Sequence, residues 1–172
     1  MDELLMVVGD RPGYTPGVAR LVAMMEYVRH ITLQEVRGLT TVQLDHLYDA
    51  ESNSIGALLQ HIASIEFYYG LTTLEGRQPT AAQEREWLPA MELGDAGRRE
   101  LRGRPLDFYV DLLGRVRAHT LEGLAARDDA WLDAEQRWGD RRVNPHWMWF
   151  HVFEDELSHR GQIRWLKRRL PG

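Results

Sequence analysis

Residues 144–171, NPHWMWFHVFEDELSHRGQIRWLKRRLP, decide the fold. They open with Asn144 and Pro145, an amide side chain able to cap a helix followed by a proline at the first helical position, where its missing N–H is tolerated. Apolar side chains then recur at helical steps: Met148, Val152, Ile163, Leu166 and Leu170. The segment therefore predicts one long helix, running to Pro171, that buries one face.

Three earlier segments carry the same kind of signal. A first helix, over residues 16–38, begins with a Thr-Pro pair and ends at a glycine. A second begins within Ser52-Asn53-Ser54, carries His61 and runs toward Gly70 or Gly76, and a third begins at Pro105. Their apolar positions at helical spacing include Val18, Leu21, Val22, Met25 and Val28, then Ile55, Leu58, Ile62 and Ile65, then Tyr109, Leu113, Val116 and Leu124.

The connections between these helices are long. Residues 39–53 are polar and irregular, and residues 76–105 are rich in charge, glycine and proline, with a short helix expected around residues 81–87. The sequence shows no convincing alternating strand pattern and no internal repeat. It therefore predicts an all-α four-helix bundle forming a single domain over residues 1–172. Connections of this length leave the order and direction of the helices open.

The composition excludes several classes of protein. Among 172 residues are 21 Lys+Arg and 26 Asp+Glu, so the net charge of -5 favours neither nucleic acid nor a membrane surface as a partner. The chain has no cysteine, which excludes disulfides, thiolate metal ligands and a cysteine nucleophile. No apolar stretch approaches the roughly 18 residues of a membrane span, and the N-terminus lacks the basic start of a signal peptide. A cytoplasmic protein is expected.

Two polar residues, Asp155 and His159, interrupt the apolar stripe of the last helix. They are four positions apart, so their side chains lie one turn apart on the same face. His61 interrupts the stripe of the second helix beside Leu58 and Ile62. If these helices face each other, His61, Asp155 and His159 form a set of two histidines and one carboxylate that suits Zn, Ni, Fe or Mn. A buried hydrogen-bonded network without a metal is the alternative.

Side chains near the predicted ligands are candidates for contacts with them. His151 lies one turn before Asp155 but further round the helix from His159, which argues against a role as ligand. Four side chains are expected to contact or orient the ligands: His151, Glu154, Arg160 and Gln162. Two aromatic side chains are expected to pack in the core or to line a ligand pocket: Trp147 and Trp149.

Two stretches of the chain resemble the DinB/YfiT-like superfamily, SIGALLQHIASIEFYY at residues 54–69 and HVFEDELSHRGQI at residues 151–163. Residues 31–45, ITLQEVRGLTTVQLD, are similar to the first helix of that superfamily and the turn after it. The resemblance implies a metal-binding four-helix bundle, often a homodimer, with one histidine on its second helix and a His-x-x-x-His pair on its fourth. Carried over by position, the ligands are His61 and His159, and Asp155 stands where the pattern has the first histidine of the pair.

The resemblance also implies a chemistry. Some relatives are metal-dependent transferases or isomerases that act with mycothiol, bacillithiol or glutathione. An open position on the metal would bind such a low-molecular-weight thiol and lower its pKa. Asp155 either keeps the site as a variant with two histidines and a carboxylate or marks a weakened site. Since a carboxylate still offers an electron pair and negative charge to a divalent ion, we expect a retained site with an altered metal preference.

Two other functions fit the same residues. One is metal-dependent hydrolysis through a bound water, with His151 or Glu154 as the base. The other is a non-catalytic bundle that binds a partner or small ligand and keeps His61, Asp155 and His159 as a structural or degenerate metal site. A fourth protein ligand would favour the second function, whereas an open metal position beside a pocket would favour catalysis.

Overall fold

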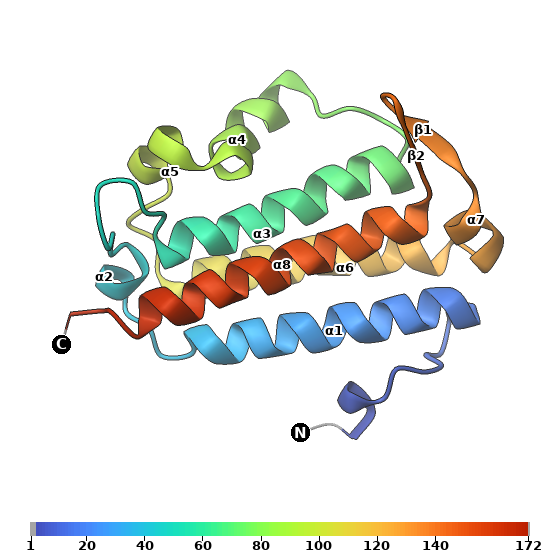
Figure 1. Cartoon of the computed structure of the whole chain (residues 1–172), viewed down its shortest axis with the longest axis horizontal. Helices are drawn as coiled ribbons and strands as arrows, with labels where there is room; N and C mark the ends of the chain where they lie inside the picture. The colour runs from blue at the N-terminus through green and yellow to red at the C-terminus, as the bar shows by residue number, and fades with distance from the viewer. Residues whose placement is uncertain (1–2, 172) are drawn as a thin grey trace.

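The computed structural model describes residues 3–171, so residues 1, 2 and 172 of the predicted domain lie outside the described residues. Four long helices lie side by side along the molecule (Figure 1). They are α1 (Pro16–Val36), α3 (Ile55–Tyr69), α6 (Leu106–Ala125) and α8 (Pro145–Lys167). The prediction of an all-α four-helix bundle is confirmed. None of the described helices is long and apolar enough to cross a membrane.

The helices do not alternate in direction along the chain. After α3 the chain returns along the bundle, so α6 starts beside the start of α3 and runs parallel to it (Figure 1). Near the two starts, Gly56 of α3 lies against the ring of Tyr109, and Leu74 lies against Gly123 near the two ends. The returning segment, within residues 76–105, holds two helices: α4 (Ala81–Glu92) and α5 (Gly94–Glu100). This return is the physical reason for the long connection.

Several short elements complete the chain. They are the 3-10 helix η1 (Glu3–Met6), α2 (Thr41–Leu44), the π-helical turn η2 (Gly70–Leu74) and α7 (Asp129–Asp133). Residues 39–53 are thus not wholly irregular, since α2 begins there with a capping box made by Thr40 and Gln43. Pro105 is the residue before α6 rather than its first residue. The short helix expected at residues 81–87 continues to Glu92.

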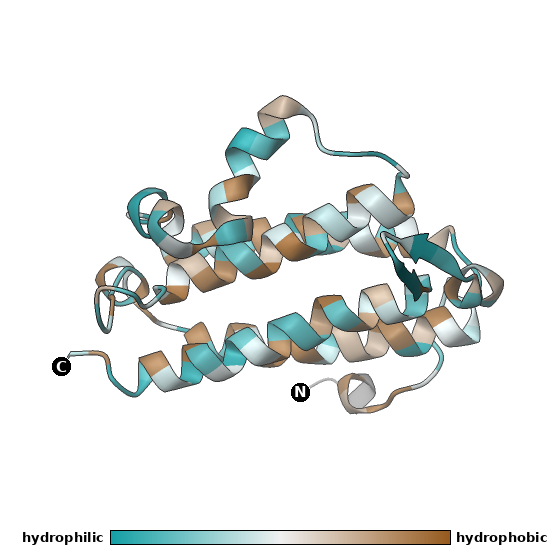
Figure 2. Ribbon diagram, turned by 45° about the horizontal axis from the view of Figure 1, so that its top comes forward, coloured by the Kyte–Doolittle hydropathy of each residue, from teal (hydrophilic) through white to brown (hydrophobic). Residues whose placement is uncertain are grey.

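A two-stranded antiparallel hairpin, β1 (Gln136–Trp138) and β2 (Arg141–Val143), departs from the prediction of a chain without strands. Its turn has Gly139 as the first of two central residues, with a φ of 60°, where glycine is favoured because it has no Cβ. Figure 2 shows both strands as hydrophilic, beside the mixed colours of the long helices. Strands of three residues, all exposed except the partly buried Val143, are too short and too polar to give an alternating pattern.

The core lies between the long helices in two main clusters. Four of the five predicted inward positions of α8 are buried: Met148, Val152, Ile163 and Leu166. The helix ends at Lys167 rather than near Pro171 as predicted, and the fifth position, Leu170, lies beyond it and is partly buried. Helices α3 and α8 pack directly against each other (Figure 1). This packing brings together the polar residues that interrupt their two stripes.

Candidate metal centre

His61 is held both by its own helix and by α4. The hydroxyl of Ser54 accepts a hydrogen bond from the backbone N–H of Ala57 and caps the start of α3. About two turns further along, His61 is 8% exposed, and its Nδ1 lies 2.8 Å from the carbonyl oxygen of Ala90 in α4. Because a carbonyl oxygen only accepts, Nδ1 carries the hydrogen, and the neutral ring keeps an electron pair on Nε2. Metal-binding histidines show this pattern.

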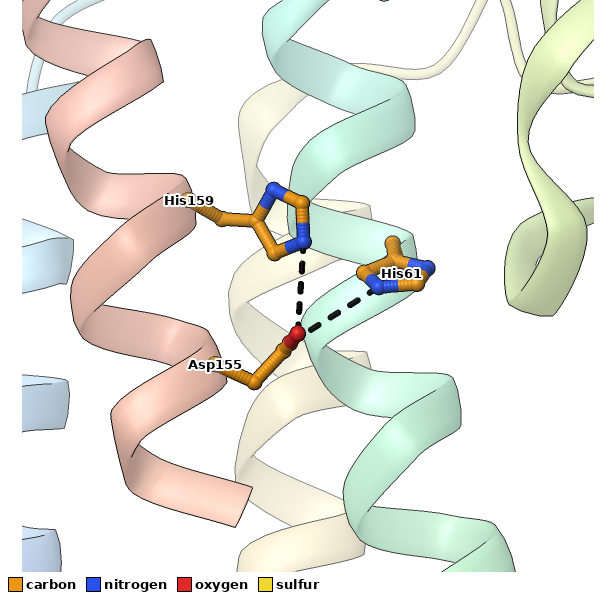
Figure 3. A group of neighbouring side chains, drawn as sticks. All are labelled: His61, Asp155 and His159. Carbon is orange, nitrogen blue, oxygen red and sulfur yellow. Dashed lines mark ion pairs between the residues drawn. The ribbon is translucent and has the colours of Figure 1, made fainter. Parts of the chain in front are cut away.

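Asp155 and His159 point from α8 toward His61 (Figure 3). The Nε2 atom of His159 lies 3.4 Å from Oδ1 of Asp155, and the Nε2 atom of His61 lies 3.7 Å from Oδ2. The two imidazole rings meet edge to face, with centroids 4.6 Å apart. One ligand atom from each residue lies within 4.8 Å of the other two. The structure thus brings the three predicted residues into one cluster, which we call the triad.

The geometry of the triad fits a divalent cation. The distances from the two Nε2 atoms to the Asp155 oxygens, 3.4 and 3.7 Å, are longer than the 2.7–3.2 Å typical of an N–H···O hydrogen bond. Two donors each about 2.1 Å from one tetrahedral ion would lie about 3.4 Å apart. In addition, Oδ2 of Asp155 is buried without a hydrogen-bond partner in the described residues. Two imidazole nitrogens and a carboxylate form a donor set that Zn, Ni, Fe and Mn accept.

The electrostatics of the triad also favour a cation. Burial raises the pKa of Asp155, but the contacts with His159 and His61 outweigh burial and hold that pKa well below its usual range. Burial lowers the pKa of His61, and contacts with Asp155 and with the backbone of α4 outweigh it, so the net shift is upward. Asp155 therefore carries its negative charge at neutral pH, partly buried between two imidazoles.

His151 and Glu154 lie outside the triad. Nδ1 of His151 is 3.0 Å from Oε2 of Glu154, and both side chains are well exposed on α8. The His151 ring stacks on Trp147, with an interplanar angle of 9°. Trp147 lines two pockets.

Three further predicted residues occupy different surroundings. Trp149 is fully buried in the core, so its ring is part of the apolar packing rather than of a pocket wall. Gln162 is exposed and lines an open pocket on α8. Arg160 makes no hydrogen bond to His159 in the described part of the chain, and its Nη1 is buried without a partner. Burial, followed by the charge of Arg164, lowers the pKa of Arg160.

A buried ion network, which the sequence reasoning missed, lies beside the triad. It takes one residue from each long helix: Arg29 of α1, Glu66 of α3, Arg117 of α6 and Glu156 of α8. Nε and Nη2 of Arg29 donate to the two oxygens of Glu156 at 3.0 Å each, and Nη2 also donates to Glu66 at 2.8 Å. Nε of Arg117 donates to Glu66 at 2.6 Å. Each of the four follows a predicted core position by one helical turn, so each is a polar residue on an apolar stripe. Asp155 was identified from a signal of the same kind.

This network is fully satisfied. The guanidinium groups also donate to backbone carbonyls, Arg29 to Leu113 and Arg117 to Met25. Burial raises the pKa of Glu66, but Arg117 and Arg29 outweigh it and lower that pKa to about 2. Buried charges with complete hydrogen bonding fix the geometry of the elements that carry them. The network therefore sets how the four helices are rotated and hence where Asp155 points.

Comparison with known proteins places this geometry in a family. A family model described as Mycothiol-S-transferase matches residues 20–172, which include the triad and the ion network. No curated protein matches the chain. Since the match spans most of the sequence, the chain belongs to the mycothiol-S-transferase family, within the DinB/YfiT-like superfamily of metal-dependent proteins.

Proposed function

We propose that the protein is a metal-dependent S-transferase that activates a low-molecular-weight thiol at the triad. One observation carries the proposal: the two Nε2 atoms of His61 and His159 face a single ionised carboxylate whose Oδ2 has no hydrogen-bond partner in the described residues. A divalent ion, Zn, Ni, Fe or Mn, would join these donors. The family match supports transfer to or from a thiol.

The number of protein ligands favours catalysis over a purely structural site. The described residues contain one group of three or more His, Cys, Asp or Glu side chains close enough to share an ion, and it has three members. An ion with three protein ligands keeps a position open for a further ligand. When bound there, a thiol loses its proton at neutral pH. Because the chain has no cysteine, the sulfur belongs to the cofactor.

A pocket lined mostly by polar residues, among them sequence neighbours of His159, supports a hydrophilic thiol. Its volume is about 510 Å³, and its lining includes Asn53, Ser158, Gln162 and Trp165. Oδ1 of Asn53 is buried without a hydrogen-bond partner in the described part of the chain. Amides, a hydroxyl and an aromatic face offer a polar cofactor both hydrogen bonds and a surface for stacking. In this proposal the pocket orients the thiol so that its sulfur reaches the triad.

The proposal includes a homodimer in the cytoplasm. The exposed face of α8 carries Phe150 and Leu157, apolar side chains of the kind that subunit interfaces cover. Light scattering on the purified chain measures the oligomeric state, and a monomer would remove this part of the proposal. A cytoplasmic location fits the use of a reduced thiol, which persists in that compartment.

Metal content and thiol chemistry test the proposed function together. We expect protein purified without a histidine tag to contain a divalent metal by elemental analysis and to attach an added thiol to a generic electrophile. His159→Ala is expected to abolish both while leaving the far-UV circular dichroism spectrum unchanged. His119→Ala, a change at an exposed histidine of α6, is the matched control and keeps both. A metal-free parent, or His159→Ala with the parent's metal content, would overturn the proposal.

A further inference from the structure

An aromatic pocket lies between α3, the hairpin and the first turns of α8. Its volume is about 300 Å³, at the lower end of the range for pockets that bind small molecules. Its walls come from three parts of the chain: Tyr69 of α3, Trp138, Arg141 and Val143 of the hairpin, and Trp147 and His151 of α8. A pocket of this size suits a ligand built around one ring.

Flat rings form most of the walls. The rings of Tyr69 and Trp138 meet edge to face, with centroids 5.5 Å apart. On the opposite wall, the indole of Trp147 and the imidazole of His151 are stacked, with centroids 5.4 Å apart. The rings of Tyr69 and His151 also meet, with centroids 6.0 Å apart, so the aromatic side chains of α3 and α8 are in contact at one edge of the pocket. Aromatic walls bind flat aromatic or conjugated ligands by stacking and edge contacts.

The hairpin supplies a positive charge to this pocket. Trp138 pairs directly with Arg141 in the ladder, and Gln136 with Val143, so these residues share one face of the hairpin. Gln136 on that face donates to Met148 of α8, which holds the hairpin against the bundle. Arg142, on the opposite face, pairs with Glu135, whereas Arg141 has no ion pair among residues 3–171.

The aromatic pocket and the triad both take residues from α3 and α8. His151 precedes Asp155 by one helical turn on α8. Tyr69 follows His61 by about two turns on α3, which runs antiparallel to α8 (Figure 1). Burial is the larger cause, and the negative charge of Asp155 the smaller one, that together raise the pKa of Tyr69 to about 12. Tyr69 is therefore close enough to Asp155 to interact with its charge. The aromatic pocket thus lies toward the hairpin end of the triad, and the pocket lined mostly by polar residues lies toward the other end.

We propose that the aromatic pocket binds the acceptor of the transfer, a flat aromatic or conjugated electrophile that carries a carboxylate. Arg141 pairs with the carboxylate, and the rings of Trp147 and Trp138 hold the conjugated plane. This inference rests on the proposed function. In the transfer, the thiolate sulfur forms a bond to an electrophilic carbon of the acceptor, and the leaving group departs with the electron pair of the broken bond. The thiol proton has already passed to solvent.

Binding of an unreactive probe tests the pocket without any turnover. The probe is 4-nitrobenzoate, and 4-nitrobenzamide is its uncharged counterpart, each titrated into the full-length protein by isothermal calorimetry. We expect the carboxylate to bind about tenfold more tightly than the amide, a difference of about 1.4 kcal/mol. Arg141→Gln is expected to erase this preference, and Trp147→Ala to weaken both probes. Tyr27→Ala is the control, because Tyr27 is an exposed aromatic residue of α1 outside this pocket, and it leaves binding unchanged.

The outcomes separate this inference from the proposed function. His159→Ala, without metal, is expected to keep the preference for 4-nitrobenzoate, because the pocket is built from other residues. Equal binding of the two probes by the parent would overturn the inference even if the parent holds a metal and activates a thiol. A loss in Tyr27→Ala as large as that in Trp147→Ala would also overturn it, since the loss at Trp147 would then not report on this pocket.

Discussion

Asp155 and Glu156 are neighbours in α8, and their carboxylates belong to two different centres. Asp155 faces His61 of α3, whereas Glu156 points into the bundle and accepts two hydrogen bonds from Arg29. Successive residues of a helix project about 100° apart, so one segment serves both centres. The pairing of Glu156 with Arg29 fixes the rotation of α8 and therefore the direction in which Asp155 points.

Glu156→Gln is expected to destabilise the protein by about 3–5 kcal/mol, because it leaves the buried charge of Arg29 short of a partner. Urea unfolding followed by circular dichroism measures the loss. Glu154→Gln, a change at an exposed glutamate of the same helix, is the control and should stay within about 0.5 kcal/mol of the parent. A similar effect of the two substitutions would show that the buried pair adds little stability.

The Glu66 carboxyl makes stability depend on pH in the acid range. Its pKa is about 2 in the folded protein against an ordinary value of 4.5, so the folded state favours the ionised form. A lowered folded-state pKa contributes stability that is present above pH 4.5 and is lost as the pH falls toward 2. The loss from this group is about 3 kcal/mol.

Unfolding free energies between pH 6 and pH 2 test this dependence on Glu66, measured with urea at each pH. We expect Glu66→Gln to start from a lower stability and to show a shallower decline. The decline should not vanish, because the pKa of Asp155 is also lowered in the folded protein. Parallel curves for the parent and Glu66→Gln would contradict the assignment of this titration to Glu66.

The contact between Gly56 and Tyr109 fixes the close approach of α3 to α6. A Cβ added at Gly56 would lie 2.5 Å from Oη of Tyr109, so Gly56→Ala is expected to destabilise the protein by about 1–3 kcal/mol. Oη of Tyr109 is buried without a hydrogen-bond partner in the described residues, so Tyr109→Phe should cost little. The double variant with Gly56→Ala and Tyr109→Phe should therefore be more stable than the variant with Gly56→Ala alone. Strictly additive effects in thermal unfolding would exclude this contact as the cause.

Local signals in the sequence were sufficient to predict the four long helices and the triad. Pro16 and Pro145 each follow a polar capping residue, and both helices begin there in the structure. The triad could be predicted because Asp155 and His159 lie on an otherwise apolar face, and packing of α3 against α8 supplied His61. The helix starts and the Asp155–His159 spacing depend on residues close in sequence, which a pattern records directly, whereas the approach of His61 depends on packing between helices.

The ion network carried a similar signal that was not recognised. Arg29 and Glu66 follow the predicted core residues Met25 and Ile62 by four positions, just as Glu156 follows Val152. A charge at such a position is usually at the edge of a stripe and solvated, so its burial depends on a partner from another helix. Pairing across helices, like the parallel course of α3 and α6, depends on long-range contacts that no local pattern contains.

Asp155 stands where the sequence resemblance leads us to expect the first histidine of a pair, and substitution there tests what the aspartate means. Under the proposed function, Asp155→Ala is expected to lose its metal, because His61 and His159 alone are a weak pair of ligands. Asp155→His is expected to keep a metal but to change the preference among Zn, Ni, Fe and Mn, since a neutral nitrogen replaces a charged oxygen. Elemental analysis of tag-free protein from cells given the same metal supply measures both. If the parent contains no metal and Asp155→His does, then aspartate has disabled the site, and the family's thiol chemistry does not operate in this chain.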